Sequence, residues 1–180
     1  YEFAFPRDHA AHPGFQTEWW YYTGHLQAKS KRFGYELTFF RVGLPRLRPQ
    51  SPSAWAARDL IFLHLALTEE SRGRFRHHEA ARRAAVGLAG ADSTRYHVWL
   101  DDAFAGLEPD GVTHRIRGAG ADFALDLRLR SEKPPTIHGE GGVSQKSAGR
   151  GNASHYYSLT RLGTTGTVVK DGDTLRATSN

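Results

Sequence analysis

Regular alternation of apolar and polar residues limits the folds open to this chain more than any other feature of its sequence. Between residues 121 and 130, every second residue is large and apolar. Because successive side chains of a β-strand point to opposite faces, this period of two predicts a strand with one buried face. Residues 59–68 repeat the pattern. The apolar positions of the two segments are Phe123, Leu125, Leu127 and Leu129, and Ile61, Leu63, Leu65 and Leu67.

Further strands are predicted where β-branched and aromatic residues gather between turn residues. These segments are residues 33–42, 95–101 and 154–162, and a hairpin is expected from residues 166–170 and 174–177. Only residues 77–90, rich in alanine and arginine, have the composition of a helix. About eight or nine strands with little helix predict an all-β fold, an antiparallel barrel or sandwich. A length of 180 residues suits one such domain.

Four consecutive aromatic rings follow a carboxylate in the run Thr-Glu-Trp-Trp-Tyr-Tyr-Thr-Gly at residues 17–24. In a strand, Glu18, Trp20 and Tyr22 share one face, while the other face carries Trp19 and Tyr21. Large rings on both faces predict a strand that is covered on both sides. A carboxylate in line with two rings suits a hydrophobic binding pocket or a proton donor to an apolar substrate.

The net charge of +5 comes mostly from arginine, and no cysteine is present. The absence of cysteine excludes disulfides, zinc–thiolate sites and a cysteine nucleophile. The only basic clusters, residues 72–76 and 82–83, form no stripe, and Phe75 is the one aromatic residue between them. This pattern predicts solvated surface rather than a nucleic-acid-binding site.

Two histidines, His9 and His12, lie close to Asp8 and Glu18 and could be read as metal ligands. Their spacing brings two imidazoles together only on a helix or a tight turn, and prolines on both sides oppose a helix. We therefore predict a structural turn in which Asp8 or His9 bonds to the backbone, and no metal site.

Two other polar positions lie inside predicted strands. His64 has apolar residues on either side, so its imidazole is expected to need a hydrogen-bond partner, either in the core or in a pocket. Residues 154–162 place serine, threonine and tyrosine on one face and Tyr157 on the other. That polar face is consistent with either solvent or a wet cavity.

A family resemblance rests on two neighbouring motifs. Phe-Pro-Arg-Asp-His-Ala-Ala-His-Pro at residues 5–13, followed by the aromatic run at 17–24, resembles the signature that opens the AttH-like and carotenoid 1,2-hydratase (hydroxyneurosporene synthase) family. Further matching segments follow in order along the chain: residues 37–41, 62–68, 87–90, 98–102, 133–135 and 156–162.

The resemblance implies a lipocalin-like fold, with two consecutive barrel-like domains that meet at a cavity. Residues 1–180 correspond to the first domain, and we expect the chain to be cut before the second, which carries the acidic residues usually held responsible for chemistry. The expected partners are a hydrophobic small molecule and that second domain, with peripheral membrane contact and no cofactor. The expected location is periplasmic or secreted.

The family resemblance also suggests a function. It implies acid-catalysed addition of water to a C=C bond of an apolar isoprenoid or polyene substrate. We predict Glu18 and His64 as catalytic polar groups, and Trp20, Tyr22, Tyr157 and Asp102 as substrate-binding residues. The alternative is a non-catalytic carrier that binds a lipid or another hydrophobic ligand in the periplasm.

Overall fold

A computed structural model describes residues 2–44, 53, 56–149 and 152–179. The described residues form β-strands and two 3-10 turns, η1 (Arg7–His9) and η2 (Glu70–Arg72). The strands are β1 (Thr17–Ala28), β2 (Lys31–Gly43), β3 (Asp59–Glu69), β4 (Arg74–Arg83), β5 (Ala89–Ala91), β6 (His97–Leu100), β7 (Ala103–Leu107), β8 (Thr113–Ala119), β9 (Phe123–Ser131), β10 (Thr136–Ile137), β11 (Val143–Gln145), β12 (Ala153–His155), β13 (Tyr157–Ser158), β14 (Leu162–Lys170) and β15 (Asp173–Thr178).

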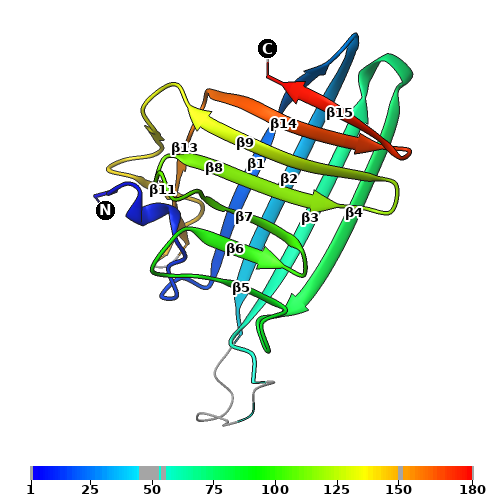
Figure 1. The fold of residues 1–180 in the computed structure, drawn as a ribbon. Coiled ribbons are helices and arrows are strands. Elements are labelled where there is room, and N and C mark those ends of the chain that lie inside the picture. Colours follow the sequence, from blue (N-terminus) through cyan, green and yellow to red (C-terminus); the bar gives the residue numbers. More distant parts are fainter. Residues whose placement is uncertain (1, 45–52, 54–55, 150–151, 180) are drawn as a thin grey trace.

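One antiparallel sheet of eleven strands dominates the fold, in the order β4-β3-β2-β1-β15-β14-β9-β8-β7-β6-β5. The sheet curls until β5 and β6 pack against β3 and β4, so that β1 to β4 run across the later strands (Figure 1). This lipocalin-like barrel confirms the all-β fold predicted from the sequence. Within the described chain, β1 pairs with β2 along its whole length but with β15 only through Gln27 and Thr178. Most of one edge of β1 therefore has no neighbouring strand.

The alternating segments form the core as predicted. In β3 and β9 the large apolar residues at every second position are buried, and they pack with Phe33, Leu37 and Phe39 of β2. The intervening residues point outward and are partly or fully exposed. The burial pattern therefore follows the period of two that the sequence displays.

The predicted hairpin near the C-terminal end is also present. It joins β14 to β15, with Lys170 paired to Asp173 across the turn. Asp171 and Gly172 both have positive φ, 49° and 85°. Two-residue turns of this hand match the twist of the flanking strands, and Asp-Gly is one of the sequences that adopt them most readily.

The helix predicted over residues 77–90 is wrong, because residues 74–83 form β4 at the edge of the sheet. The alanine-rich composition is overridden by pairing with β3, in which Leu65 lies opposite His78 and Leu63 opposite Ala80. Alternate residues of β4 turn toward the barrel, and Arg76 is buried among them. A period of two is present here, but of the inward positions 76, 78 and 80 only Ala80 is apolar.

The single strand predicted over residues 154–162 is wrong as well. The segment is divided into β12 and β13, which pair with β11 and β10 in two small ribbons outside the main sheet. Between them, the Tyr156 carbonyl accepts a hydrogen bond from the His138 amide at 2.9 Å. Hydrogen bonds to the preceding loop thus hold this segment, and β14 begins only at Leu162.

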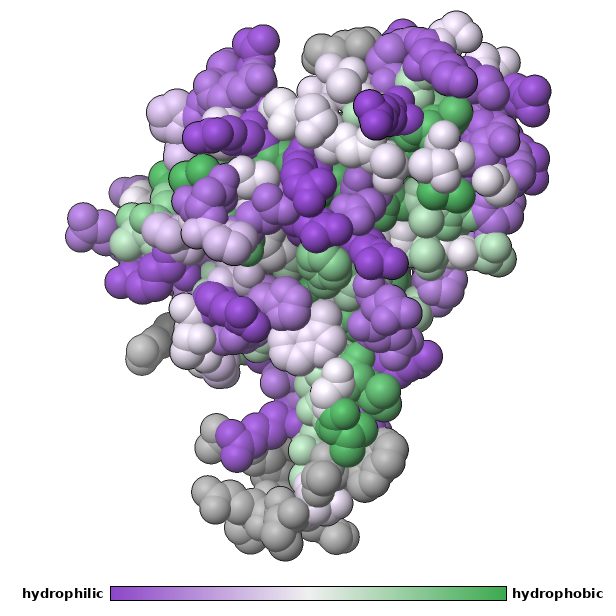
Figure 2. All heavy atoms as spheres, viewed as in Figure 1, coloured by the Kyte–Doolittle hydropathy of each residue, from purple (hydrophilic) through white to green (hydrophobic). Residues whose placement is uncertain are grey.

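The surface matches the expectation of solvated charge. Hydrophilic residues cover most of the face in Figure 2, with apolar residues in small groups among them. Arg76 is the exception in the basic clusters: its guanidinium is buried and contacts Asp122 at 3.1 Å and Asp171 at 2.8 Å. The helical segments in the described part of the chain are single turns, too short and too polar for a membrane span.

Candidate functional site

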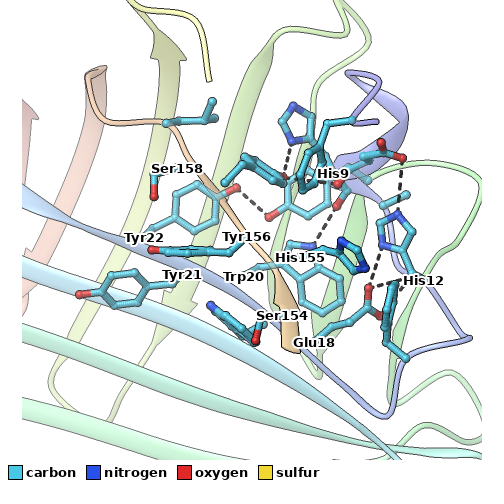
Figure 3. A pocket seen from close by; sticks show the side chains of 18 of the residues that line it. His9, His12, Glu18, Trp20, Tyr21, Tyr22, Ser154, His155, Tyr156 and Ser158 are labelled. Carbon is cyan, nitrogen blue, oxygen red and sulfur yellow. Dashed lines mark hydrogen bonds and ion pairs between the residues drawn. The ribbon is translucent and has the colours of Figure 1, made fainter. Parts of the chain in front are cut away.

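A pocket of about 420 Å³ lies along the free edge of β1. Every residue from 17 to 23 lines it, together with residues 153–160 and the N-terminal segment around His9 (Figure 3). Side chains from both faces of β1 reach the pocket because, among the described residues, no strand pairs with this edge at residues 17–23. The pocket thus occupies the place where a neighbouring strand would otherwise lie.

The rings of the aromatic run divide into an inner and an outer pair. Trp20 and Tyr22 are buried, whereas Trp19 is 39% exposed and Tyr21 is 53% exposed. The prediction that the strand is covered on both sides is therefore wrong for the outer pair. Segment 153–160 covers only part of it, through Tyr156, whose ring centroid lies 6.0 Å from that of Trp19.

Tyr22, Tyr96 and His114 form a buried hydrogen-bonded group in the pocket wall. The Tyr22 hydroxyl lies 2.7 Å from the Tyr96 hydroxyl and 2.9 Å from Nδ1 of His114. Burial raises the pKa of both tyrosines well above the usual value for a phenol. Burial, with a smaller contribution from the nearby His9, lowers the pKa of His114 to about 3. All three side chains are therefore neutral at neutral pH.

His9 and Tyr157 form a second pair beside the first group. Nδ1 of His9 lies 2.7 Å from the Tyr157 hydroxyl, and the Trp20 indole donates to the His9 carbonyl at 2.9 Å. Burial lowers the pKa of His9 to about 4, although Asp8 opposes this shift. The rings of His9 and His114 meet edge to face, with centroids 5.0 Å apart. Together the two groups make an uncharged wall that can donate and accept hydrogen bonds.

Glu18 lies at the other end of the pocket and is fully engaged by donors. Its Oε2 accepts from Nε of Arg41 at 2.7 Å, and its Oε1 accepts from the His12 amide at 2.8 Å and lies 2.9 Å from Nδ1 of His12. Arg41 also donates to Asp59 at 2.6 Å. This network fastens the N-terminal segment to β1 and β2, so Glu18 acts as an acceptor that holds structure.

The turn predicted around His9 is confirmed. Residues 7–9 form η1, and Oδ2 of Asp8 accepts a hydrogen bond from the Ala4 amide at 2.7 Å. The nearby Arg7 also donates to this carboxylate, through Nε at 2.8 Å. Among the described residues, no three histidine, aspartate or glutamate side chains are grouped as a metal ion would require.

Two of the predicted site residues lie away from the pocket. His64 belongs to the outer face of β3, is exposed, and packs its ring 5.3 Å from that of Phe40. Its neighbours two positions away are also on the outer face, so the apolar setting expected for it is wrong. Asp102 is exposed in the turn between β6 and β7. Neither residue lines the pocket, whereas Glu18, Trp20, Tyr22 and Tyr157 do.

The pocket residues that were not predicted for this role include three of the hydrogen-bonded wall: His9, Tyr96 and His114. His114 could have been found, because it shares the inward face of β8 with the buried Ile116 two positions later. His9 was assigned only to a turn. Tyr96 precedes β6, and nothing in its local sequence indicates that it faces a pocket.

Comparison with known proteins places the chain in a family. A family model described as AttH-like matches residues 1–180. The solved structure of an AttH protein from Nitrosomonas europaea has a TM-score of 0.86 and 34% sequence identity, and the match covers 99% of this chain and 53% of that chain.

Kievitone hydratase from Nectria haematococca shares the fold, with a TM-score of 0.70 and 10% identity over 97% of this chain and 47% of that chain. The present chain therefore spans about half the length of either solved protein. No curated protein matches it. Because the family model extends over every residue, the chain belongs to the AttH-like family.

Proposed function

We propose that this lipocalin-like domain binds an apolar isoprenoid or polyene and forms one wall of a hydratase site in the complete protein. The observation that carries the proposal is the pocket along β1, where aromatic rings from two segments surround a space of ligand size. The fold shared with kievitone hydratase agrees with a hydration reaction.

Hydration of an alkene begins when an acid protonates one carbon and a carbocation forms on the other. A water oxygen then bonds to the cationic carbon and releases a proton, so that one water molecule is added overall. Aromatic faces stabilise a nearby cation by roughly 1–2 kcal/mol per ring when water is excluded. In the proposed reaction, the rings of Trp20 and Tyr157 supply this stabilisation.

The described pocket wall does not supply the acid that would protonate the alkene. Glu18 and Asp8 are the two carboxylates of the described pocket lining, and both accept hydrogen bonds from several donors. Burial makes the wall tyrosine Tyr22 a weaker acid, and it leaves His9 and His114 without the extra proton that they would have to donate. We therefore assign the acid to the second lipocalin-like domain that the family resemblance implies.

The occupied state of both carboxylates also favours the second candidate, a non-catalytic carrier. The two functions share ligand binding and differ in turnover. Incubating the full-length protein with apolar polyenes in water labelled with heavy oxygen separates them by mass spectrometry. Incorporation of the label supports the hydratase, binding without incorporation supports the carrier, and the absence of binding contradicts both.

A matched pair of variants tests whether this pocket is the site. Trp19→Ala removes a half-exposed ring that lines the pocket, whereas Phe75→Ala removes an exposed ring outside it. Binding and label incorporation should fall for Trp19→Ala and stay unchanged for Phe75→Ala. Equal effects of the two substitutions would contradict the assignment of this pocket as the ligand-binding site.

A further inference from the structure

The charge of the pocket differs sharply from that of the chain. The chain has 24 lysine and arginine residues and a net charge of +5, yet none of the described residues that line the pocket is a lysine or an arginine. The formal charges of the lining belong to Asp8 and Glu18. Their arginine partners, Arg7 and Arg41, contact these carboxylates without lining the pocket.

The two buried histidines of the wall, His9 and His114, do not replace the missing cations. His9 and His114 are buried and hydrogen-bonded to tyrosine hydroxyls, and burial lowers the pKa of each far below neutral pH. His12 lies between the two carboxylates, 2.9 Å from Glu18 and 3.5 Å from Asp8. Any positive charge on His12 is therefore matched by groups that are already present.

An anionic ligand is poorly served by such a lining. A carboxylate or phosphate that enters loses hydration, finds no lysine or arginine in the described lining, and meets two carboxylates whose arginine partners lie outside that lining. A neutral ligand oxygen, in contrast, can form a hydrogen bond with the wall. If Tyr157 donates to Nδ1 of His9, its own oxygen can still accept from a ligand hydroxyl. In the other histidine tautomer, Nδ1–H donates to Tyr157, and the phenol proton can then be given to a ligand oxygen in place of the Asp8 carbonyl, which lies 3.5 Å away.

We infer that the ligand is an uncharged apolar molecule with a hydroxyl or carbonyl oxygen, and that Tyr157, supported by His9, binds this oxygen. This inference rests on the proposed function and narrows its ligand class. The volume of the pocket indicates the size of this ligand. A cavity of about 150 Å³ holds benzene, so 420 Å³ corresponds to roughly three six-carbon groups.

Three probes that share one carbon skeleton test the inference: farnesol, farnesene and farnesoic acid carry a hydroxyl, no oxygen and a carboxylate. Titration at pH 7.5 can be followed by fluorescence of Trp19 and Trp20, which line the pocket. Farnesol should bind about tenfold more tightly than either of the others, the ratio that one net hydrogen bond of about 1.4 kcal/mol provides.

Tyr157→Phe should lower the affinity for farnesol to that for farnesene and leave farnesene unchanged. Tyr35→Phe is the matched control, because Tyr35 is also a buried tyrosine but does not line the pocket. If Tyr157→Phe does not fold, the three-probe comparison on the unsubstituted protein still decides whether the ligand is uncharged and carries an oxygen.

Each contrary result has its own meaning. Farnesoic acid or farnesene binding as tightly as farnesol overturns this inference and leaves the apolar-ligand role in place. A Tyr157→Phe variant that keeps the preference for farnesol overturns the assignment of Tyr157. Failure of all three probes to bind overturns the proposed function together with the inference.

Discussion

Replacement of Arg41 by leucine should strongly destabilise the fold. The Arg41 guanidinium is buried at the junction of the N-terminal segment with β1 and β2. It donates to Glu18 at 2.7 Å, to Asp59 at 2.6 Å, and to the carbonyls of His12 and Phe15 at 3.1 and 2.6 Å. Leucine fills part of the same volume but provides none of these donors.

The size of the loss follows from the burial of the partners. The Glu18 side chain is 12% exposed, so without Arg41 its carboxylate remains largely cut off from water, whereas Asp59 is 27% exposed and can be partly rehydrated. Leaving one partner of a buried pair costs about 3–5 kcal/mol. We therefore expect a loss of about 4 kcal/mol, which lowers the melting temperature by roughly 8–16 °C in a chain of this size.

Urea unfolding monitored by tryptophan fluorescence measures the change in the free energy of unfolding. Removing both charges, in Glu18→Leu with Arg41→Leu, should recover much of the loss because no unpaired charge is left. Arg115→Leu is the matched control, since its pair with Asp126 is about one third exposed and should contribute about 1 kcal/mol or less. Equal losses for the two single arginine substitutions, or no recovery in the double variant, would refute this reasoning.

Two further predictions concern pH and a second ion pair. The folded-state pKa values of His9 and His114, about 4 and about 3, lie below the unfolded value of 6.5, so the unfolded state binds more protons as the pH falls from 6.5 toward 4. Each histidine should then lower the free energy of unfolding by about 1.4 kcal/mol per pH unit in that window. The free energy of unfolding, measured by denaturation at several pH values between 6.5 and 4, should fall less steeply with pH in His114→Asn than in the unsubstituted protein. Equal pH dependence of the two proteins would contradict the prediction. Lys170→Met should lower the melting temperature, because Nζ of Lys170 lies 3.1 Å from the fully buried Glu69 carboxylate. Adding Glu69→Gln should restore most of the loss, and a double variant no more stable than Lys170→Met would count against a charge effect.

The fold was largely predictable because its strands carry local signals. The alternation in residues 123–129 and the Asp-Gly turn at 171–172 each specify structure within a few residues. The sequence of residues 77–90 favours a helix, but residues 74–83 form a strand because edge pairing with β3 outweighs helix propensity. His64 misled for another reason: both faces of β3 carry apolar side chains, so apolar neighbours do not distinguish the inside of the barrel from the outside.

The site was predictable only in part. Trp20 and Tyr22 stand in a distinctive run, and Tyr157 stands in an unusually polar segment, so each could be selected from its local sequence. His9 and His114 come from different elements, η1 and β8, and their meeting depends on how the barrel closes. Contacts made across 105 positions of the chain leave no periodic signal in a single sequence.

The two small ribbons beside the pocket have a consequence for diversification. β10 pairs with β13 and β11 with β12, and neither ribbon belongs to the eleven-stranded sheet that contains the core. Residues 153–158 line the pocket from outside that sheet, so substitutions there can reshape this side of the wall without changing the pairing of the barrel strands. The opposite side of the wall is different, because Trp20, Tyr22 and Tyr96 also belong to the hydrophobic core. Related proteins can therefore vary ligand choice through the first side while the second side keeps the fold.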